Sequence, residues 1–181
     1  MTFQPRFLMA VPLMLAAVLA SGCASTSTGD GGAKAASGGS AAAELNATYV
    51  TGEGPKSVAE AKGKVLIVDF WATYCDPCKK SFPKYQEMLD QFGGDLAVIG
   101  VSVDAPDDTS EEKLKAFAKD TGVKFPILWD KEHKTADAYK PPNMPTSYII
   151  DKQGNIHKMH AKYEGGEETK IVEEVKALLA K

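Results

Sequence analysis

The sequence predicts an α/β domain with a mixed central β-sheet flanked by helices, and three observations support this fold class. Two short apolar, β-branched runs, Val65–Trp71 and Leu96–Val103, are typical of buried strands. Segments with helical signals alternate with these runs along the chain. Two later apolar runs flank a turn cluster, Asp151–Asn155, and predict a hairpin. Alternating strands and helices followed by a hairpin imply parallel and antiparallel strands in one sheet.

The composition is that of a globular protein. The chain has 181 residues, of which 44% are hydrophobic and 25% charged, which excludes wholesale disorder and collagen-like repeats. The single arginine, Arg6, lies in the first 22 residues, and without them 20 lysines face 24 acidic residues, a net charge of −4. Such a chain lacks the clustered cations that bind phosphate backbones, so we expect no nucleic-acid partner.

The N-terminus has the pattern of a targeting signal. Arg6 precedes an uncharged apolar run, residues 7–20, which is shorter than the ~20 residues that span a membrane as a helix. The segment Leu19–Cys23 resembles the bacterial lipobox, which implies cleavage before Cys23 and lipid on its sulfur. We therefore expect residues 1–22 to be a lipoprotein signal peptide. The alternative is an ordinary signal peptide with a chance cysteine.

The next segment is expected to be a flexible tether, residues 23–44. From Ala24 to Ala43 nearly every residue is Ser, Thr, Gly or Ala, so the segment cannot bury enough apolar surface to offset its ordering entropy. A lipid anchor and a tether would hold a soluble domain, residues 45–181, at a membrane surface. The predicted location is the bacterial cell envelope, with the domain facing the periplasm or the outer surface.

The first half of that domain shows two helix signals. Pro77–Phe92 is predicted to be a helix because proline suits a first helical turn and Gly93-Gly94 would end it. Thr109 and Glu112 have the spacing of a capping box, which opens a helix that stops at Gly122.

The second half continues the alternation of strands and helices. Phe125–Trp129 predicts a third buried strand and Lys131–Tyr139 a short helix. Thr146–Ile150 and Ile156–Met159 are the two hairpin strands. Glu167–Ala180 predicts a final helix, whose apolar stripe we assign to core packing: Ile171, Val175, Leu178 and Leu179.

The chemistry is concentrated in Cys75-Asp76-Pro77-Cys78, at a strand-to-helix junction. Residues three apart on a helix share a face with Cβ atoms ~5–6 Å apart, so small adjustments allow a disulfide. The positive helix N-terminus lowers the pKa of the Cys75 thiol and raises its thiolate fraction. Cys75 is therefore the predicted attacking thiolate and Cys78 the resolving thiol.

Other uses of the cysteine pair stay open. It could form half of a zinc site, although a structural site needs about four ligands, or a static disulfide, although a loop this short is a weak constraint. It could handle Cu(I), with Met144 and Met159 as soft ligands. It could also belong to a redox-silent binding module.

Two segments resemble a known fold. Residues 68–80 (VDFWATYCDPCKK) resemble the thioredoxin-fold active-site segment, and Met144-Pro145-Thr146 resembles the cis-proline segment of that fold. Together with the lipobox and tether, they resemble the TlpA/ResA-like membrane-anchored thiol–disulfide oxidoreductases. The resemblance implies a thioredoxin-like fold with an extra strand–helix insertion between Cys78 and Pro145.

The resemblance also implies roles for single residues. Cys75 and Cys78 match the redox disulfide, which needs no further cofactor and no metal. Pro145 matches the cis-proline beside that disulfide, and the Met144 backbone would pair with an extended substrate. We assign substrate binding to residues flanking these motifs: Trp71, Tyr74, Pro77, Met144, Pro145 and Thr146.

Asp69 is expected to be catalytic. It interrupts an apolar strand, and a buried carboxylate is costly unless it is functional or has a raised pKa. The resemblance implies that it helps to move the proton of Cys78. The structural alternative is a carboxylate bonded to a nearby lysine.

The expected partners are disulfide-containing proteins outside the cytoplasm and a membrane thiol–electron donor, with the protein itself a monomer. Ser81 stands where the cytochrome c maturation branch commonly has glutamate, which puts apocytochrome c in question as the substrate. Asp76 disfavours a nearby thiolate and favours the reductase direction. His133 and the pair His157 and His160 are expected to be exposed or at a sheet edge.

Overall fold

A computed structural model describes residues 39–181. One seven-stranded sheet runs through this part of the chain in the order β1-β7-β6-β3-β4-β5-β2. The strands lie at the following positions: β1 (Ser40–Ala41), β2 (Thr48–Thr51), β3 (Val65–Trp71), β4 (Leu96–Ser102), β5 (Ile127–Trp129), β6 (Thr146–Ile150) and β7 (Asn155–Ala161). β3 pairs in parallel with β4 and antiparallel with β6, so the predicted mixed sheet is confirmed.

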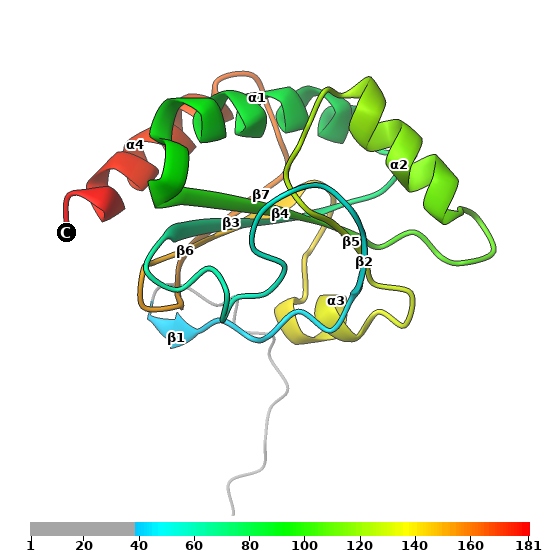
Figure 1. Ribbon diagram of the computed structural model, residues 1–181, viewed down its shortest axis with the longest axis horizontal. Helices are drawn as coiled ribbons and strands as arrows, with labels where there is room; N and C mark the ends of the chain where they lie inside the picture. The colour runs from blue at the N-terminus through cyan, green and yellow to red at the C-terminus, as the bar shows by residue number, and fades with distance from the viewer. Residues whose placement is uncertain (1–38) are drawn as a thin grey trace, which may run out of the picture. The chain divides into compact units, whose positions relative to one another are not determined.

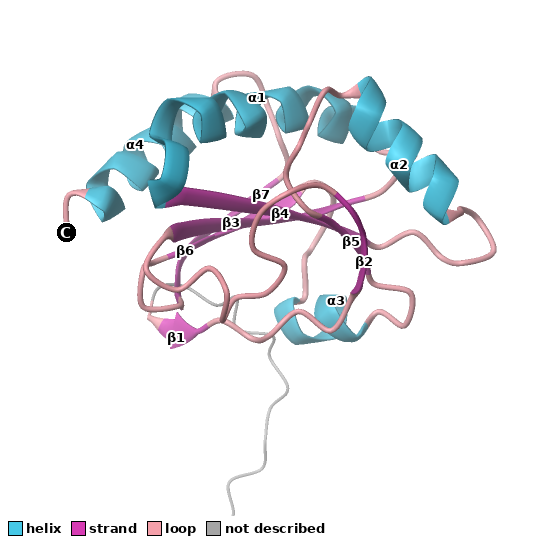
Figure 2. Cartoon of the chain, viewed as in Figure 1, coloured by secondary structure: helices cyan, strands magenta, loops and turns pink. Residues whose placement is uncertain are grey.

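Helices cover both faces of this sheet (Figures 1 and 2). They are α1 (Asp76–Phe92), α2 (Glu111–Asp120), α3 (Lys134–Tyr139) and α4 (Glu167–Leu179), with a 3-10 turn at Gly93–Asp95. Helices α1, α2 and α4 lie on one face, and α3 lies on the other. No helix of residues 39–181 is long and apolar enough to cross a membrane.

The alternation of β3 side chains explains these two layers. All seven residues of β3 are buried. Val65, Ile67 and Trp71 pack with α1, α2 and α4, whereas Val68 and Phe70 pack on the α3 side. Successive strand side chains point to opposite faces, so a strand with helices on both sides reads as a continuous apolar run.

The predicted helices form, with corrected starts and ends. α1 begins at Asp76, one residue before the prediction, because Cys75 is its N-cap. The predicted cap of α2 is wrong: the Ser110 hydroxyl, not Thr109, accepts the Lys113 N–H, and the Thr109 side chain is buried. α4 buries Ile171, as expected for its apolar stripe.

The strands show two further differences. β5 is shorter than predicted and begins after Pro126, which has no N–H to donate to a ladder. β2 lacks a strong apolar signal and was not predicted, but it pairs antiparallel with β5 at one edge of the sheet.

At the other edge, β1 lies inside the range expected to be a tether. Ser40 and Ala41 pair antiparallel with β7. The Ala42 N–H donates to Gly154 O at 2.9 Å, and the Tyr139 hydroxyl donates to Ala43 O at 2.6 Å. The ordered sheet therefore includes residues upstream of 45.

Candidate active site at the start of helix α1

Cys75 and Cys78 are joined by a disulfide at the junction of β3 and α1, with their Cα atoms 5.3 Å apart. Cys75 caps the helix, and its Sγ accepts the Cys78 N–H at 3.2 Å. Such N–H donors at a helix N-terminus favour a thiolate. The Cys75 side chain is 6% exposed and that of Cys78 is fully buried. Of the two cysteines, only Cys75, the one predicted to attack, keeps any exposed surface.

The turn that leads to Cys75 is held by Asp104, which the sequence analysis missed. The Asp104 carboxylate accepts bonds from the Thr73 N–H and, at 2.6 Å, from the Thr73 hydroxyl. The Ser102 hydroxyl donates to the same carboxylate at 2.8 Å. The available signal was an acidic residue directly after the second buried strand, since parallel strands β3 and β4 end at the same edge of the sheet.

The segment before β6 reaches the same end of the sheet. Phe70 pairs with Thr146, so the antiparallel register places residues 144–146 beside the end of β3. The Met144–Pro145 peptide bond is cis. Pro145 and Thr146 are buried, and the Thr146 hydroxyl donates to Asn143 O at 2.6 Å. Met144 is half-buried, which leaves it as the accessible member of this segment.

Asp69 is fully buried on β3, on the face that carries Trp71 and packs against α1. Its Oδ1 accepts the Ser147 hydroxyl at 2.7 Å and the Tyr85 hydroxyl at 3.2 Å. Within residues 39–181 its hydrogen-bond donors are these two hydroxyls and no lysine. Burial raises the pKa of Asp69 from 3.8 to about 7, and the two hydroxyl bonds only partly oppose this effect. The carboxyl therefore titrates near neutral pH.

The residues assigned to substrate binding lie in different environments. Tyr74 is 68% exposed, and Pro77 is also exposed. Trp71 has no exposed surface and stacks in the core against Phe117, with ring centroids 4.3 Å apart. The structure therefore places Trp71 behind the site, where its role is packing.

A groove of about 550 Å³ opens beside the exposed residues. Tyr74 and Met144 line it, together with Val103 and with residues from the start of α3 to the loop after it: His133, Ala136, Asp137, Lys140, Pro141, Pro142 and Asn143. The groove brings together three segments that are far apart in the sequence. It is the apolar-lined surface next to the disulfide.

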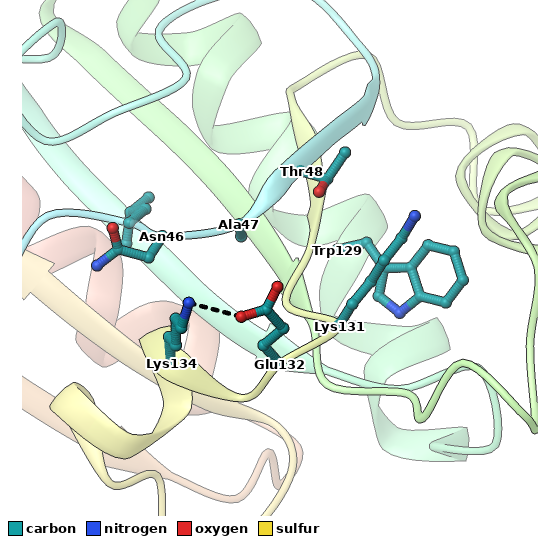
Figure 3. Close-up of a pocket in the computed structure, with 8 residues that line it drawn as sticks. Asn46, Ala47, Thr48, Trp129, Lys131, Glu132 and Lys134 are labelled. Atoms are coloured by element: carbon teal, nitrogen blue, oxygen red, sulfur yellow. Dashed lines mark ion pairs between the residues drawn. The ribbon is translucent and has the colours of Figure 1, made fainter.

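A second hollow, of about 370 Å³, is lined by neither cysteine (Figure 3). It lies where residues 45–48 approach the segment after β5. Lys131 stacks over the Trp129 ring, and Lys134 pairs with Glu132. These lysines already have partners in the hollow.

Charge beside the disulfide is partly compensated. The Asp76 carboxylate is 84% exposed and pairs with the Lys79 ammonium at 2.9 Å. This ion pair lowers the pKa of Asp76. The negative charge between the cysteines is thus present at neutral pH but offset by Lys79.

The two histidines of β7, which are expected from the sequence to be exposed or at a sheet edge, differ in their burial. His157 is exposed, but His160 lies on the opposite face, 6% exposed. Its ring nitrogens lie 2.7 Å from Glu167 and Glu174 of α4. The spacing of three residues between His157 and His160 correctly predicts that their side chains lie on opposite faces of the sheet. It does not predict that α4 covers the face with His160. Within residues 39–181 no cluster of three or more His, Cys, Asp or Glu side chains is arranged to hold a metal.

The expected signal peptide and the lipid-bearing Cys23 lie outside the described residues. They remain predictions from the sequence.

Comparisons with known proteins agree with the fold and the cysteine pair. Residues 39–159 match the AhpC/TSA family. The thioredoxin-like protein YneN of Bacillus subtilis is 35% identical over 122 residues, which cover 67% of this chain and 70% of YneN. The thiol–disulfide oxidoreductase ResA of Bacillus cereus is 35% identical over 105 residues, 58% of this chain and 59% of ResA.

A solved structure extends the comparison. The crystal structure of the exposed lipoprotein thioredoxin Etrx1 from Streptococcus pneumoniae superposes with a TM-score of 0.62 at 28% identity. The match covers 75% of this chain and all of that one. The predicted thioredoxin-like fold and the resemblance to ResA are confirmed.

The raised pKa of Asp69 makes stability depend on pH. Between pH ~4 and ~7 the folded protein holds a proton that the unfolded chain has lost, so the free energy of unfolding falls as pH rises. Asp69→Asn keeps the oxygen that accepts the hydroxyl bonds and removes the titration. We expect it to match the parent protein near pH 4 and to exceed its unfolding free energy by up to about 4 kcal/mol at pH 8.

Urea denaturation of the oxidised protein at both pH values measures this difference. Asp107→Asn, at an exposed carboxylate, is the matched control and should change neither value by more than about 0.5 kcal/mol. An Asp69→Asn effect of equal size at pH 4 and pH 8 would contradict the burial of an ionisable carboxyl.

Proposed function

The chain belongs to the AhpC/TSA family of thioredoxin-fold proteins and is a thiol–disulfide oxidoreductase, and from this premise we propose that it reduces disulfides of other proteins outside the cytoplasm. The observation that supports this most strongly is the asymmetry of the pair, with Cys75 at the surface and Cys78 enclosed. A partner can reach only one sulfur, which sets the order of the two exchange steps.

In the first step the Cys75 thiolate attacks one sulfur of the partner's disulfide. A Cys75–partner bond forms, the partner's own disulfide breaks, and its second sulfur leaves as a thiolate. The α1 N-terminus and the Cys78 N–H stabilise the thiolate that attacks. Tyr74 and Met144, which line the groove beside the pair, are suited to contact the partner segment.

In the second step Cys78 gives up its proton and attacks Cys75. The Cys75–Cys78 disulfide forms, and the bond between Cys75 and the partner breaks. The partner's sulfur leaves with the electron pair and takes a proton. Asp69, with a pKa near neutrality, is suited to accept the Cys78 proton. The partner is released reduced and the protein is oxidised, so a thiol donor must restore the dithiol.

The reductase direction rests on Asp76. A carboxylate next to Cys75 disfavours the thiolate of the reduced form and makes the pair a stronger reductant, an effect that Lys79 partly offsets. The donor we propose is a membrane thiol–disulfide protein, and the domain acts as a monomer.

Ser81 bears on the substrate. It is fully buried and donates to Cys78 O at 3.2 Å, and so has no surface with which to select a partner. It stands where the cytochrome c maturation branch commonly has a glutamate. We therefore propose protein disulfides in general, rather than apocytochrome c, as the substrate class.

We propose membrane attachment through Cys23. Residues 19–23 support it, because they resemble a lipobox. Residues 24–38 have the composition of a linker. The superposable Etrx1 is itself described as an exposed lipoprotein. The domain would then face the periplasm or the outer surface.

Insulin reduction tests the activity. We expect the full chain in detergent, supplied with dithiothreitol, to precipitate insulin faster than dithiothreitol alone. Cys75→Ser should lose this acceleration because it removes the attacking sulfur. Cys78→Ser should also lose turnover but accumulate a mixed disulfide with insulin, which non-reducing electrophoresis detects.

The double variant Cys75→Ser/Cys78→Ser is the control for that mixed disulfide. Full activity in Cys75→Ser would contradict the mechanism. An inactive parent protein that binds Cu(I) through Cys75 would instead indicate copper handling. An inactive parent without Cu(I) binding would indicate a redox-silent binding module.

The reduction potential tests the direction. We expect a value near that of thioredoxin, about −270 mV, rather than that of strong periplasmic oxidants, about −120 mV. Asp76→Asn should make the potential less negative because it removes the charge that disfavours the thiolate, whereas Asp107→Asn should not change it. Equilibration in glutathione buffers measures all three. A strongly oxidising parent protein would overturn the reductase assignment.

Cell fractionation tests the anchor. In a bacterial host that processes lipoproteins, the parent protein should incorporate labelled palmitate and sediment with membranes. Cys23→Ala should lose the label and move to the soluble fraction. A labelled Cys23→Ala protein would place the lipid elsewhere.

A further inference from the structure

We propose that Tyr85 and Ser147 form a hydroxyl relay that holds Oδ1 of Asp69 as a permanent acceptor and leaves Oδ2 as the oxygen that takes and releases the proton. The inference rests on the proposed function, because it concerns how Asp69 serves Cys78. It adds two positioning residues, one on α1 and one on β6, that contact no partner.

The geometry of three oxygens carries the proposal. Ser147 Oγ lies 2.7 Å from Asp69 Oδ1, and Tyr85 Oη lies 2.5 Å from Ser147 Oγ. Tyr85 Oη lies farther from Asp69 Oδ1, at 3.2 Å. Each hydroxyl has one hydrogen. The short contacts are best satisfied when Tyr85 donates to Ser147 and Ser147 donates to the carboxyl.

The second carboxyl oxygen of Asp69 differs from the first in its surroundings. Asp69 Oδ2 is buried and has no hydrogen-bond partner among the described residues. A proton placed on Oδ1 would have to displace the Ser147 hydroxyl, whereas a proton on Oδ2 displaces nothing. An unpaired buried oxygen is expensive, and such atoms are frequently functional.

Asp69 lies on the face of β3 that packs against α1, the helix that begins at the cysteine pair. Tyr85 is seven positions after Cys78, which is two helical turns, so both lie on the same buried face of α1. Cys78 and Tyr85 pack in the same cluster as the β3 residues on the Asp69 face, including Trp71. Tyr85 therefore reaches the Asp69 carboxyl from α1, the helix that carries Cys78. Ser147 contacts the same carboxyl from β6, where it is paired with Asp69.

Other titratable groups surround this relay. His160 is paired with Ser147 across the β6–β7 ladder and holds Glu167 and Glu174 of α4. Burial, followed by the charge of Asp69, raises the pKa of Tyr85 well above its usual value, and Tyr163 adds a smaller effect. His160 hydrogen-bonds to the two α4 carboxylates, and within residues 39–181 the side-chain hydrogen bonds of Asp69 are to Ser147 and Tyr85.

The pKa of Asp69 can be measured without any activity. In the oxidised full chain, the carbonyl stretch of the buried, protonated carboxyl should vanish from the infrared spectrum near pH 7, and Asp69→Asn identifies the band. Ser147→Ala removes the direct donor to the carboxylate and should shift this midpoint upward by about one pH unit. Tyr85→Phe should shift it less, because its hydroxyl acts mainly through Ser147.

The relay also predicts the infrared midpoint of a double variant. With Ser147 removed, the Tyr85 hydroxyl can donate directly to Asp69 Oδ1, 3.2 Å away, so Tyr85→Phe should raise the midpoint more in the Ser147→Ala background than in the parent protein. Two full, additive shifts would overturn the relay, and so would an unchanged midpoint in Ser147→Ala. Ser147→Thr keeps the hydroxyl and should have the same midpoint as the parent protein. This variant keeps the test valid if the alanine variant does not fold.

Two controls separate the relay from general effects. Tyr148→Phe removes the neighbouring buried hydroxyl, which donates to Tyr139 O on the other face of the sheet, and should leave the midpoint unchanged. His160→Gln removes the nearby histidine and should also leave it. A shift in either control as large as that of Ser147→Ala would overturn the proposal.

Kinetics then distinguish the relay from the proposed function. The rate at which Cys78 releases a preformed Cys75 mixed disulfide should rise with pH along the Asp69 titration, and Ser147→Ala should move this profile upward by the same shift as the infrared midpoint. An infrared shift with an unmoved rate profile would support the relay as a device that sets the pKa but refute Asp69 as the base for Cys78.

Discussion

The site depends on the central position of β3. This strand pairs along its whole length with β4 and over five residues with β6, and every one of its side chains is buried. Because β3 is paired on both sides, the position at which the chain leaves the sheet after Trp71 is fixed. The turn to Cys75, the Asp104 carboxylate after β4 and the cis-proline segment before β6 all meet at that one end of the sheet.

The same centrality explains why Asp69 is both costly and useful. A carboxyl placed in the middle of a fully buried strand cannot be solvated, and its pKa rises to about 7. The structure does not relieve this with a cation. It provides the Ser147 hydroxyl, which donates to the carboxylate, and the Tyr85 hydroxyl, which lies beside both groups. The free energy of unfolding therefore falls as pH rises from about 4 to about 7, and the protein gains a buried group that can change its charge near neutral pH.

The sequence predicts the elements better than it predicts their contacts. Apolar runs and caps identify β3, β4, α1 and α4, because local periodicity carries that information. The cysteine pair and Pro145 are found because their motifs are compact. Asp104 and Ser147 could not be assigned in the same way, since their roles arise from strand register. The burial of Trp71 and His160 could not be predicted for a related reason: whether an aromatic or a histidine is covered depends on which helix crosses it.

The short strand β1 lies outside β7 and covers part of that edge of the sheet. β7 has seven residues, and without Ser40 and Ala41 its outer backbone groups would all be open. Exposed strand edges invite pairing with another chain. A form of the protein cut at residue 44 would uncover Asn155 and Ile156 and would also leave the Tyr139 hydroxyl without the Ala43 carbonyl. Residues 39–43 therefore cover the first two residues of the β7 edge, and a shortened form of the protein that keeps this pairing should begin upstream of Gly39.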